Sequence, residues 1–558
     1  MKKKWLSRTI AAMLAGVMSV SMLAACGQEQ EETQVSANTS TESTPATEPS
    51  SEEVEESGEI TYPLEKAEEI SIFVYEGIPV ADVYASADES PWHSGLEKQT
   101  GVDIDWQYPA KGADPQALLN LMWQDEELPS IVYGQCTSLS NTVTWLEDGL
   151  IWDLTEYVPK YAPDYWEFLN RPENADEKKA MMTDDGKILA LYGASESQYN
   201  VTYLGPVVRQ DWLDECGLEA PRTLEEWEKV LEVFKEKYNA TLAFRFGRYN
   251  TSGGISSGTG AQAPLTARYY LNDNNQVCYG TYGPEWKAML EVLNRWYEKG
   301  YLSPDFATDD DTTVRAKALN GEIGVAITAM SQLTNWEVDA KAEGTGANWV
   351  GFQYPATEVG APITYHYVKR CLASAYGACI TTGCTEEEMI TALKFLNYGY
   401  TEEGMMYHNF GVEGETYTVD AKGNVVWTDL ITKDEGGLDA AVRKYCGTHT
   451  GTLVTIQMEQ FVKAKNSEAA GEAVYKWVEN TAAKDYQMPT VVLTEEENAA
   501  FAELNTALST YVAEMALKFV TGKESLDKYE DFEKTLNEMG LAKCLEIQQA
   551  AVDRYFGK

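Results

Sequence analysis

Short apolar runs alternate with helix-like segments over the first part of the chain. Three runs have the length and the apolar or alternating character of strands: residues 69–77, 102–110 and 128–134. Three segments carry helix signals, such as helical spacing of apolar positions or an early proline: residues 91–101, 114–127 and 141–150. This alternation is typical of a parallel sheet covered by helices on both faces. The pattern therefore predicts an α/β fold with a doubly wound sheet.

The alternation continues too far for a single sheet. Strand-like and helical segments recur from residue 186 to about 360, and a strand over 370–380 followed by a helix over 385–400 resembles the first units again. An open sheet of ordinary width has about 4–6 strands. We therefore predict two lobes joined by hinge crossovers, with a ligand cleft between them at the carboxyl ends of strands. The predicted boundaries are 60–200 for lobe 1, with a return segment at about 372–412, and 206–360 for lobe 2, with about 413–558.

Two helix signals are more specific. Thr223 and Glu226 have the spacing of a capping box at the start of a helix that extends to Tyr238. From Thr494 onward the chain has the pattern of a long helix followed by two more. The sequence thus predicts a helical C-terminal region.

The N-terminus has the pattern of a secretion signal. Basic residues at positions 2–4 and 8 precede a mostly apolar stretch over residues 9–25. The stretch "LAAC" at 23–26 resembles a bacterial lipobox, in which the cysteine is lipidated and becomes the first residue after cleavage. Only a thiol can form the thioether to a diacylglyceryl group, so Cys26 is the predicted lipidation site. The alternatives are an ordinary cleaved signal with a chance cysteine and an uncleaved signal anchor.

A linker follows the predicted signal peptide, which spans residues 1–25. Residues 26–59 contain the lipidated cysteine and then a segment rich in Ser, Thr, Glu and Pro, with ten acidic residues and no basic ones. Such a segment buries too little apolar surface to offset its ordering entropy. We therefore predict a disordered acidic stalk that extends from the extracellular face of a bacterial cytoplasmic membrane.

Charge and composition narrow the range of partners. The chain has 88 acidic against 44 basic residues and a net charge of −44, so nucleic acid and anionic membrane surfaces are not expected partners. The charge also argues against highly anionic ligands unless a basic pocket lies inside. Apart from Cys26, the cysteines and the four histidines lack metal-ligand spacing. We expect mostly buried free thiols, no metal site and no cofactor.

Seven fragments, in chain order, carry a resemblance to a known family. They include "GLIWDLTEYVPKYAPDYW", "DGKILALYG", "VVRQDWLDECGLEAPRTLEEW", "WYEKGYLSPDFATDD", "GEIGVAI" and "GVEGETYTVDAKGNVVW", and end with residues 512–555. Behind a lipobox they resemble the extracellular solute-binding lipoproteins of bacterial ABC importers, and most closely the branch associated with oligosaccharide uptake. The resemblance covers nearly all of residues 69–558.

The resemblance implies a fold, a ligand and partners. The fold is the two-lobed type II periplasmic-binding-protein fold, and the ligand is a carbohydrate held without chemistry. The partners are the transmembrane subunits of a permease with a cytoplasmic ATPase, the membrane is reached through the lipid anchor only, and the protein is a monomer. Several relatives have a calcium loop at the place of residues 235–244, but this segment has no comparable set of oxygen ligands.

Aromatic and polar residues near predicted strand ends are the candidates for sugar binding. Binding a sugar needs planar hydrogen-bonding groups for its edge and aromatic rings for its C–H face. The candidates are Trp92, His93, Tyr133 and Gln135 in lobe 1, Tyr199 and Tyr203 near the first crossover, Arg248, Tyr249, Ser331, Gln332 and Trp336 in lobe 2, and Tyr365 and His366 before the return strand. For each of them the alternative is an ordinary half-buried loop residue. Arg209 and Asp211 are expected to form a charged pair that orients the hinge.

Other interpretations remain open from the sequence. The same fold can bind a peptide or another small solute. A surface glycoside hydrolase would need two carboxylates at a defined separation, and the sequence singles out no such pair. The glycine-rich residues 250–264 lack the lysine of a phosphate-binding loop, and a flexible loop at the rim of the cleft is predicted instead.

Overall fold

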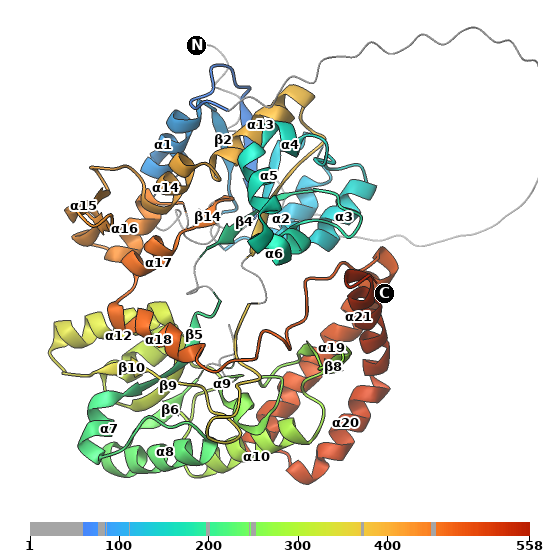
Figure 1. Ribbon diagram of the computed structural model, residues 1–558. Helices are drawn as coiled ribbons and strands as arrows, with labels where there is room; N and C mark the ends of the chain where they lie inside the picture. Colours follow the sequence, from blue (N-terminus) through green and yellow to red (C-terminus); the bar gives the residue numbers. More distant parts are fainter. Residues whose placement is uncertain are drawn as a thin grey trace, which may run out of the picture. The chain divides into compact units, whose positions relative to one another are not determined.

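The computed structural model describes residues 60–75, 84, 86–110, 112–125, 127–196, 201–244, 246, 253–369, 373–447 and 453–557. Within these ranges the chain forms two mixed sheets surrounded by helices, and two short hairpins (Figure 1). None of the described helices is long and apolar enough to span a membrane. The predicted signal peptide, Cys26 and the linker lie outside the described residues.

The first sheet has the strand order β14-β4-β11-β3-β1-β2. Its strands are β1 (Ile70–Val74), β2 (Ile104–Gln107), β3 (Ile131–Gly134), β4 (Leu191–Ser195), β11 (Ala373–Ile380) and β14 (Ile456–Gln457). β1 pairs in parallel with β2 and β3, as the alternating pattern predicts. β11 runs antiparallel to β3 and β4, because it enters this sheet on its return from the second one.

The second sheet has the order β10-β5-β9-β6. Its strands are β5 (Leu204–Arg209), β6 (Thr241–Ala243), β9 (Ile323–Ala329) and β10 (Trp349–Gly351). β5 runs antiparallel to both β9 and β10, whereas β6 is parallel to β9. The hairpins are formed by β7 (Tyr269–Leu271) with β8 (Val277–Tyr279) and by β12 (Tyr417–Val419) with β13 (Val425–Trp427).

Helices supply the rest of both hydrophobic cores. The core of the first sheet includes residues of α1 (Pro91–Thr100), α2 (Pro115–Met122), α3 (Leu139–Glu147), α4 (Val158–Tyr161), α5 (Pro163–Asn170), α6 (Ala175–Met181), α13 (Glu386–Tyr398) and α14 (Glu402–Phe410). The cores around the second sheet include residues of α7 (Gln210–Cys216), α8 (Leu224–Tyr238), α9 (Gly253–Ser256), α10 (Pro284–Glu298), α11 (Asp311–Leu319), α12 (Met330–Glu343), α15 (Asp429–Thr432), α16 (Leu438–Tyr445), α17 (Glu459–Lys465) and α18 (Glu468–Trp477). The predicted helical C-terminal region is formed by α19 (Glu495–Val520), α20 (Tyr529–Glu538) and α21 (Leu541–Tyr555).

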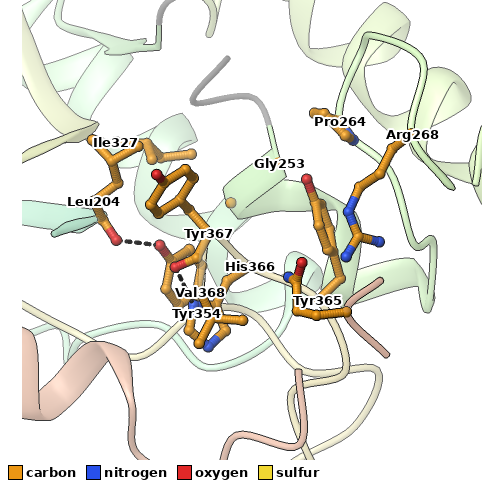
Figure 2. Close-up of a pocket in the computed structure, with 12 residues that line it drawn as sticks. Leu204, Gly253, Pro264, Arg268, Ile327, Tyr354, Tyr365, His366, Tyr367 and Val368 are labelled. Carbon is orange, nitrogen blue, oxygen red and sulfur yellow. Dashed lines mark hydrogen bonds between the residues drawn. The ribbon is translucent and has the colours of Figure 1, made fainter. Parts of the chain in front are cut away.

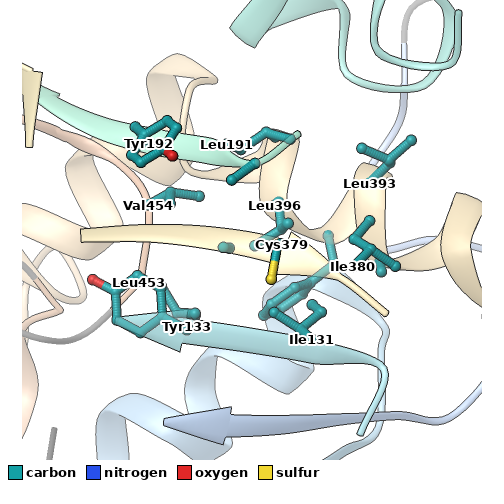
Figure 3. Close-up of a cluster of buried hydrophobic side chains, with 14 of the residues drawn as sticks. Ile131, Tyr133, Leu191, Tyr192, Cys379, Ile380, Leu393, Leu396, Leu453 and Val454 are labelled. Carbon is teal, nitrogen blue, oxygen red and sulfur yellow. The ribbon is translucent and has the colours of Figure 1, made fainter. Parts of the chain in front are cut away.

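The centre of the first sheet is packed with buried, mostly apolar side chains. Figure 3 shows buried side chains of β3 (Ile131, Tyr133), β4 (Leu191, Tyr192) and β11 (Cys379, Ile380) next to Leu393 and Leu396 of α13. Burial of this surface drives the association of strands that are more than 200 residues apart in the chain. The seven described cysteines are free thiols, as predicted; Cys371 lies outside the described residues.

Glycines let α18 lie directly on the second sheet. The ring of Trp477 covers Gly205 of β5 so closely that an added Cβ would lie 2.2 Å from it, and Ala473 covers Gly351 of β10 at the same distance. The indole Nε1 of Trp477 donates to the carbonyl of Pro206 at 2.9 Å. These close approaches are possible only without a side chain at the two positions.

Two details differ from the sequence-based expectation. Thr223 accepts from the amide of Glu226, but the carboxylate of Glu226 accepts from the amide of Arg222 instead of that of Thr223, so the capping box is only half formed. In addition, β14 pairs with β4 of the first sheet, although residues 413–558 were assigned to the second lobe. β14 has only two residues, which is too short for a periodic pattern in the sequence. The lobe boundaries stay predictions.

Candidate functional site

A cavity of about 250 Å³ lies where the second sheet meets the segment that leads to β11. β5, α9, β9 and residues 354–368 all contribute to its wall (Figure 2). The lining residues are Leu204, Gly253, Gly254, Pro264, Arg268, Ile327, Tyr354, Tyr365, His366, Tyr367, Val368 and Gln487. Of the predicted ligand-binding residues, Tyr365 and His366 belong to this lining.

His366 is held in one orientation and one tautomer. Its Nδ1 lies 3.0 Å from the carbonyl of Tyr367, so this nitrogen must carry the proton, and Nε2 accepts from the hydroxyl of Thr481 at 2.7 Å. The imidazole stacks on the ring of Tyr354 with 4.6 Å between centroids, and the Tyr354 hydroxyl donates to the carbonyl of Leu204. Burial lowers the pKa of His366 to about 4. The imidazole is therefore neutral at pH 7 and helps to fix the wall.

Arg268 and Tyr365 form a second part of the wall. The guanidinium lies 4.5 Å from the centroid of the Tyr365 ring, and Figure 2 shows the two side chains next to each other. Nη1 of Arg268 donates to the carbonyl of Gln262 at 2.6 Å. Burial lowers the pKa of Arg268. Burial also raises the pKa of Tyr365, and the charge of Arg268 offsets only part of this rise. The arrangement brings a cation and an aromatic ring to the same cavity.

Tyr203 lies next to this cavity without lining it. Its ring makes an edge contact with Tyr367 at 4.8 Å between centroids. The amide of Met330 donates to the carbonyl of Tyr203, and the amide of Lys369 donates to that of Val201. The segment entering β5 and the segment leading to β11 are thus hydrogen-bonded beside the cavity.

The glycine-rich segment forms part of the wall rather than an exposed rim. Gly253 and Gly254 are buried in α9, and an added Cβ at Gly253 would lie 3.0 Å from the ring of Tyr365. Ser256 donates to the carbonyl of Ala263 at 2.6 Å. The described part of this segment is therefore packed, because small residues allow Tyr365 and Ile327 to approach its backbone.

Trp92 and His93 are placed in the core of the first lobe. They are only 2% and 1% exposed at the start of α1. Nε2 of His93 lies 2.6 Å from the hydroxyl of Tyr108, and its ring packs edge-on against Trp106. Burial lowers the pKa of His93 to about 3. In this structure both side chains contribute to an aromatic cluster.

The other predicted residues lie in separate places. Tyr133 is buried in β3 and stacks on Tyr376 of β11, and Gln135 is exposed just after that strand. Trp336 packs against Trp349, whereas Ser331 is exposed and Gln332 half-buried on the first turn of α12. Tyr199, Arg248 and Tyr249 lie outside the described residues.

Sequence reasoning missed several residues of the cavity. Arg268, Tyr354 and Tyr367 are the polar and aromatic ones, and Gln487 comes from far along the chain. Arg268 follows no recognisable strand end, and only its position between the glycine-rich segment and "YYL" at 269–271 marks it in the sequence. Tyr367 directly follows two predicted residues, so it could have been included.

Three comparisons place the chain among known proteins. The fructooligosaccharide ABC transporter substrate-binding protein FusA of Streptococcus pneumoniae is 23% identical over 527 residues, which cover 89% of this chain and 92% of FusA. Lipoprotein LipO of Bacillus subtilis is 23% identical over 357 residues, or 61% of this chain and 66% of LipO. An HMO-binding ABC-transporter-associated solute-binding protein from Bifidobacterium longum infantis has a TM-score of 0.69 and 17% identity, covering 88% of this chain and 99% of that one.

The structural likeness shows the fold, which is the predicted α/β, two-lobed type II periplasmic-binding-protein fold. The model of one family, described as bacterial extracellular solute-binding protein, matches residues 93–411, which is more than half of the chain. The match confirms the family that the resemblance in the sequence implied. The chain belongs to the bacterial extracellular solute-binding proteins.

Proposed function

We propose that this protein is the substrate-binding lipoprotein of an ABC transporter, and that it captures an oligosaccharide between its lobes and delivers it to the membrane permease. The observation that carries the proposal is the similarity to FusA, a fructooligosaccharide-binding protein, over 89% of this chain. A local match would support only a shared lobe, whereas this one includes both lobes and the segments that connect them.

The cavity next to β5 and β9 has the chemistry that a sugar requires. Tyr365 and Tyr367 supply ring faces, and Arg268 and Gln487 supply planar hydrogen-bonding groups. Its volume of about 250 Å³ is slightly below the range of about 300–1,000 Å³ for ligand pockets. We infer that it holds one part of an oligosaccharide, and that further residues on both lobes hold the rest.

Binding without bond cleavage is the proposed activity. Glycoside hydrolysis uses a pair of carboxylates that flank the scissile bond. The described residues that line the cavity are aromatic, amide, cationic, imidazole or apolar, with no Asp or Glu among them. This lining supports capture of the sugar and supplies no acid–base pair to hydrolyse it.

The proposed partners and location follow from the family and the N-terminus. We propose that Cys26 is lipidated and that the monomeric protein is anchored to the extracellular face of the cytoplasmic membrane. LipO, a relative, is itself a lipoprotein. The proposed receivers of the sugar are the transmembrane subunits of a permease with a cytoplasmic ATPase.

Thermal shifts of the purified protein test the ligand class. A panel would contain neutral fructooligosaccharides such as kestose, acidic oligosaccharides, and tri- to pentapeptides. A glycan present at 100 times its Kd stabilises the folded state by about 2.7 kcal/mol. A shift with glycans and none with peptides is the expected result. Shifts with peptides only would instead favour a peptide-binding protein, and release of shorter sugars from a bound glycan would contradict binding without chemistry.

A further inference from the structure

Arg268 is a cation in the cavity wall without a carboxylate partner among the described residues. Nη1 donates to the carbonyl of Gln262, and the Tyr365 ring lies against the guanidinium. Nη2 is buried and has no hydrogen-bond partner in the described part of the chain. A buried charge is costly unless it is paired and hydrogen-bonded. The chain has 88 acidic residues and a net charge of −44, so the lack of a carboxylate partner for Arg268 is not due to a shortage of acidic residues.

Other arginines of this protein show which donors matter. Arg209 binds the two carboxylate oxygens of Asp211 through Nε and Nη2, at 2.8 and 2.5 Å. Arg315 binds Asp339 through the same two nitrogens, at 2.6 and 2.7 Å. In Arg268 the hydrogen bond to Gln262 takes Nη1, so the Nε–Nη2 edge is the one that remains for a ligand.

We propose that the Nε–Nη2 edge of Arg268 binds a carboxylate of the ligand, so that the captured oligosaccharide contains uronic-acid-type sugars. The inference rests on the proposed function, because it names the class of sugar that the same site takes. A carboxylate is planar and presents two oxygens to this edge, as Asp211 and Asp339 do elsewhere in the fold. The Tyr365 ring orients the guanidinium and holds that edge in place.

The cavity also accounts for how an acidic protein can take an acidic ligand. The net charge of −44 repels an anion at long range, but this repulsion is screened beyond about 8 Å at physiological ionic strength. Inside the cavity the charge–charge interaction with Arg268 is screened much less. Local attraction at one desolvated guanidinium can therefore outweigh the field of a distant, hydrated surface.

Calorimetric titration of matched sugars tests the proposal. Trimeric uronates (galacturonate, mannuronate and glucuronate types) are compared with their carboxyl-reduced, neutral counterparts and with a sulfated trisaccharide. At least one uronate is expected to bind wild-type protein about tenfold or more tightly than its reduced form, since only the carboxylate can form a bidentate, charge-assisted hydrogen bond with the guanidinium. Equal affinity of every uronate and its reduced form, or preference for the sulfated sugar, would overturn the carboxylate assignment.

Variants then assign the effect to the residue. Arg268→Met keeps the apolar stem and removes the fork, and should weaken binding of the uronate at least tenfold more than binding of its reduced form, so that the preference for the uronate is lost. Arg268→Lys keeps the charge without the planar fork and should weaken uronate binding by about tenfold; it serves if the Met variant does not fold. Arg222→Met, on an exposed i,i+4 pair, is the matched control and should bind as wild type.

The outcomes separate this inference from the proposed function. If neutral oligosaccharides bind tightly and Arg268→Met has no effect, the sugar-binding function stands and the carboxylate assignment fails. If no glycan of either kind binds, the proposed function itself fails.

Discussion

Three buried histidines resist protonation in the folded protein. His93, His366 and His408 are at most 2% exposed, and burial lowers the pKa of each of them. Their partners are rings and hydroxyl or carbonyl groups, without a carboxylate at hydrogen-bond distance in the described residues. All are therefore neutral in the folded state at pH 7 and charged only at a lower pH than a free histidine.

This predicts loss of stability in mild acid. The unfolded chain binds protons on these histidines near pH 6.5, whereas His408 in the folded protein does so only near pH 3, so stability is complete above 6.5 and falls between these values. One such histidine contributes about 1.4 kcal/mol per pH unit in this window. Phe fits the aromatic surroundings of His408. Urea titrations at pH 7 and pH 5 should show that the free energy of unfolding falls less with pH in His408→Phe than in the wild type, by about 1.4 kcal/mol for each pH unit below 6.5. Parallel pH curves for the variant and the wild type would contradict the assignment.

At the scale of the elements, one side chain joins two helices of the first lobe. α5 has no side-chain cap of its own, because Ala162 occupies the N-cap position. Asn397, buried near the end of α13, accepts from the amides of Asp164 and Tyr165 and donates to the Asp164 carboxylate at 2.7 Å. A residue more than 200 positions away thus caps the helix.

Asn397→Ala should lower the free energy of unfolding by about 2–3 kcal/mol, because it removes the cap and leaves buried polar groups without partners. Denaturant titration measures the change. Asn170→Ala, at the exposed end of α5, is the control and should change stability by less than about 0.5 kcal/mol. If both variants had the same stability, the capping role of Asn397 would be wrong.

The contact between α18 and β5 gives a second prediction at this scale. Gly205→Ala places a methyl group in the space of the Trp477 ring, and overpacking of this kind costs about 1–3 kcal/mol. The variant should unfold at lower urea concentration, and adding Trp477→Leu should recover part of the loss caused by the methyl group. Lys476→Ala on the same helix removes only an exposed ion pair and should have little effect. Additive losses in the double variant would argue against a direct clash.

An element can be predicted from the sequence when nearby residues determine it, and not when pairing with a distant part of the chain does. The apolar run at 69–77 predicts β1, and the segment at 385–400 predicts α13, because runs of buried apolar residues of these lengths are visible in the sequence. The antiparallel direction of β11 and the pairing of β14 leave none, since they depend on where the chain comes from. The half-formed capping box has a local cause, because Arg222, the residue before Thr223, binds the carboxylate of Glu226.

At the scale of the whole molecule, the site is assembled from distant parts of the chain. Leu204 and Gln487 line the same cavity, and no local pattern connects them. Tyr365 and His366 could be predicted because they precede a recognisable return strand. Trp92 and His93 come after the first predicted strand, and in the fold they belong to a buried aromatic cluster. Position next to a predicted strand therefore does not by itself identify a site residue, because only the tertiary packing shows which side chains reach a cavity.

The position of the whole protein in the cell depends on the predicted lipid at Cys26. Two or more acyl chains give stable membrane attachment, and the acidic residues 27–59 would act as a spacer that keeps the protein near its permease at high effective concentration. Cys26→Ser should move the protein from the membrane fraction to the medium and abolish incorporation of labelled palmitate. Cys278→Ser, at a half-buried free thiol, is the control and should stay in the membrane fraction. If the Cys26 variant also stayed there without lipid, an uncleaved signal anchor would replace the lipoprotein assignment.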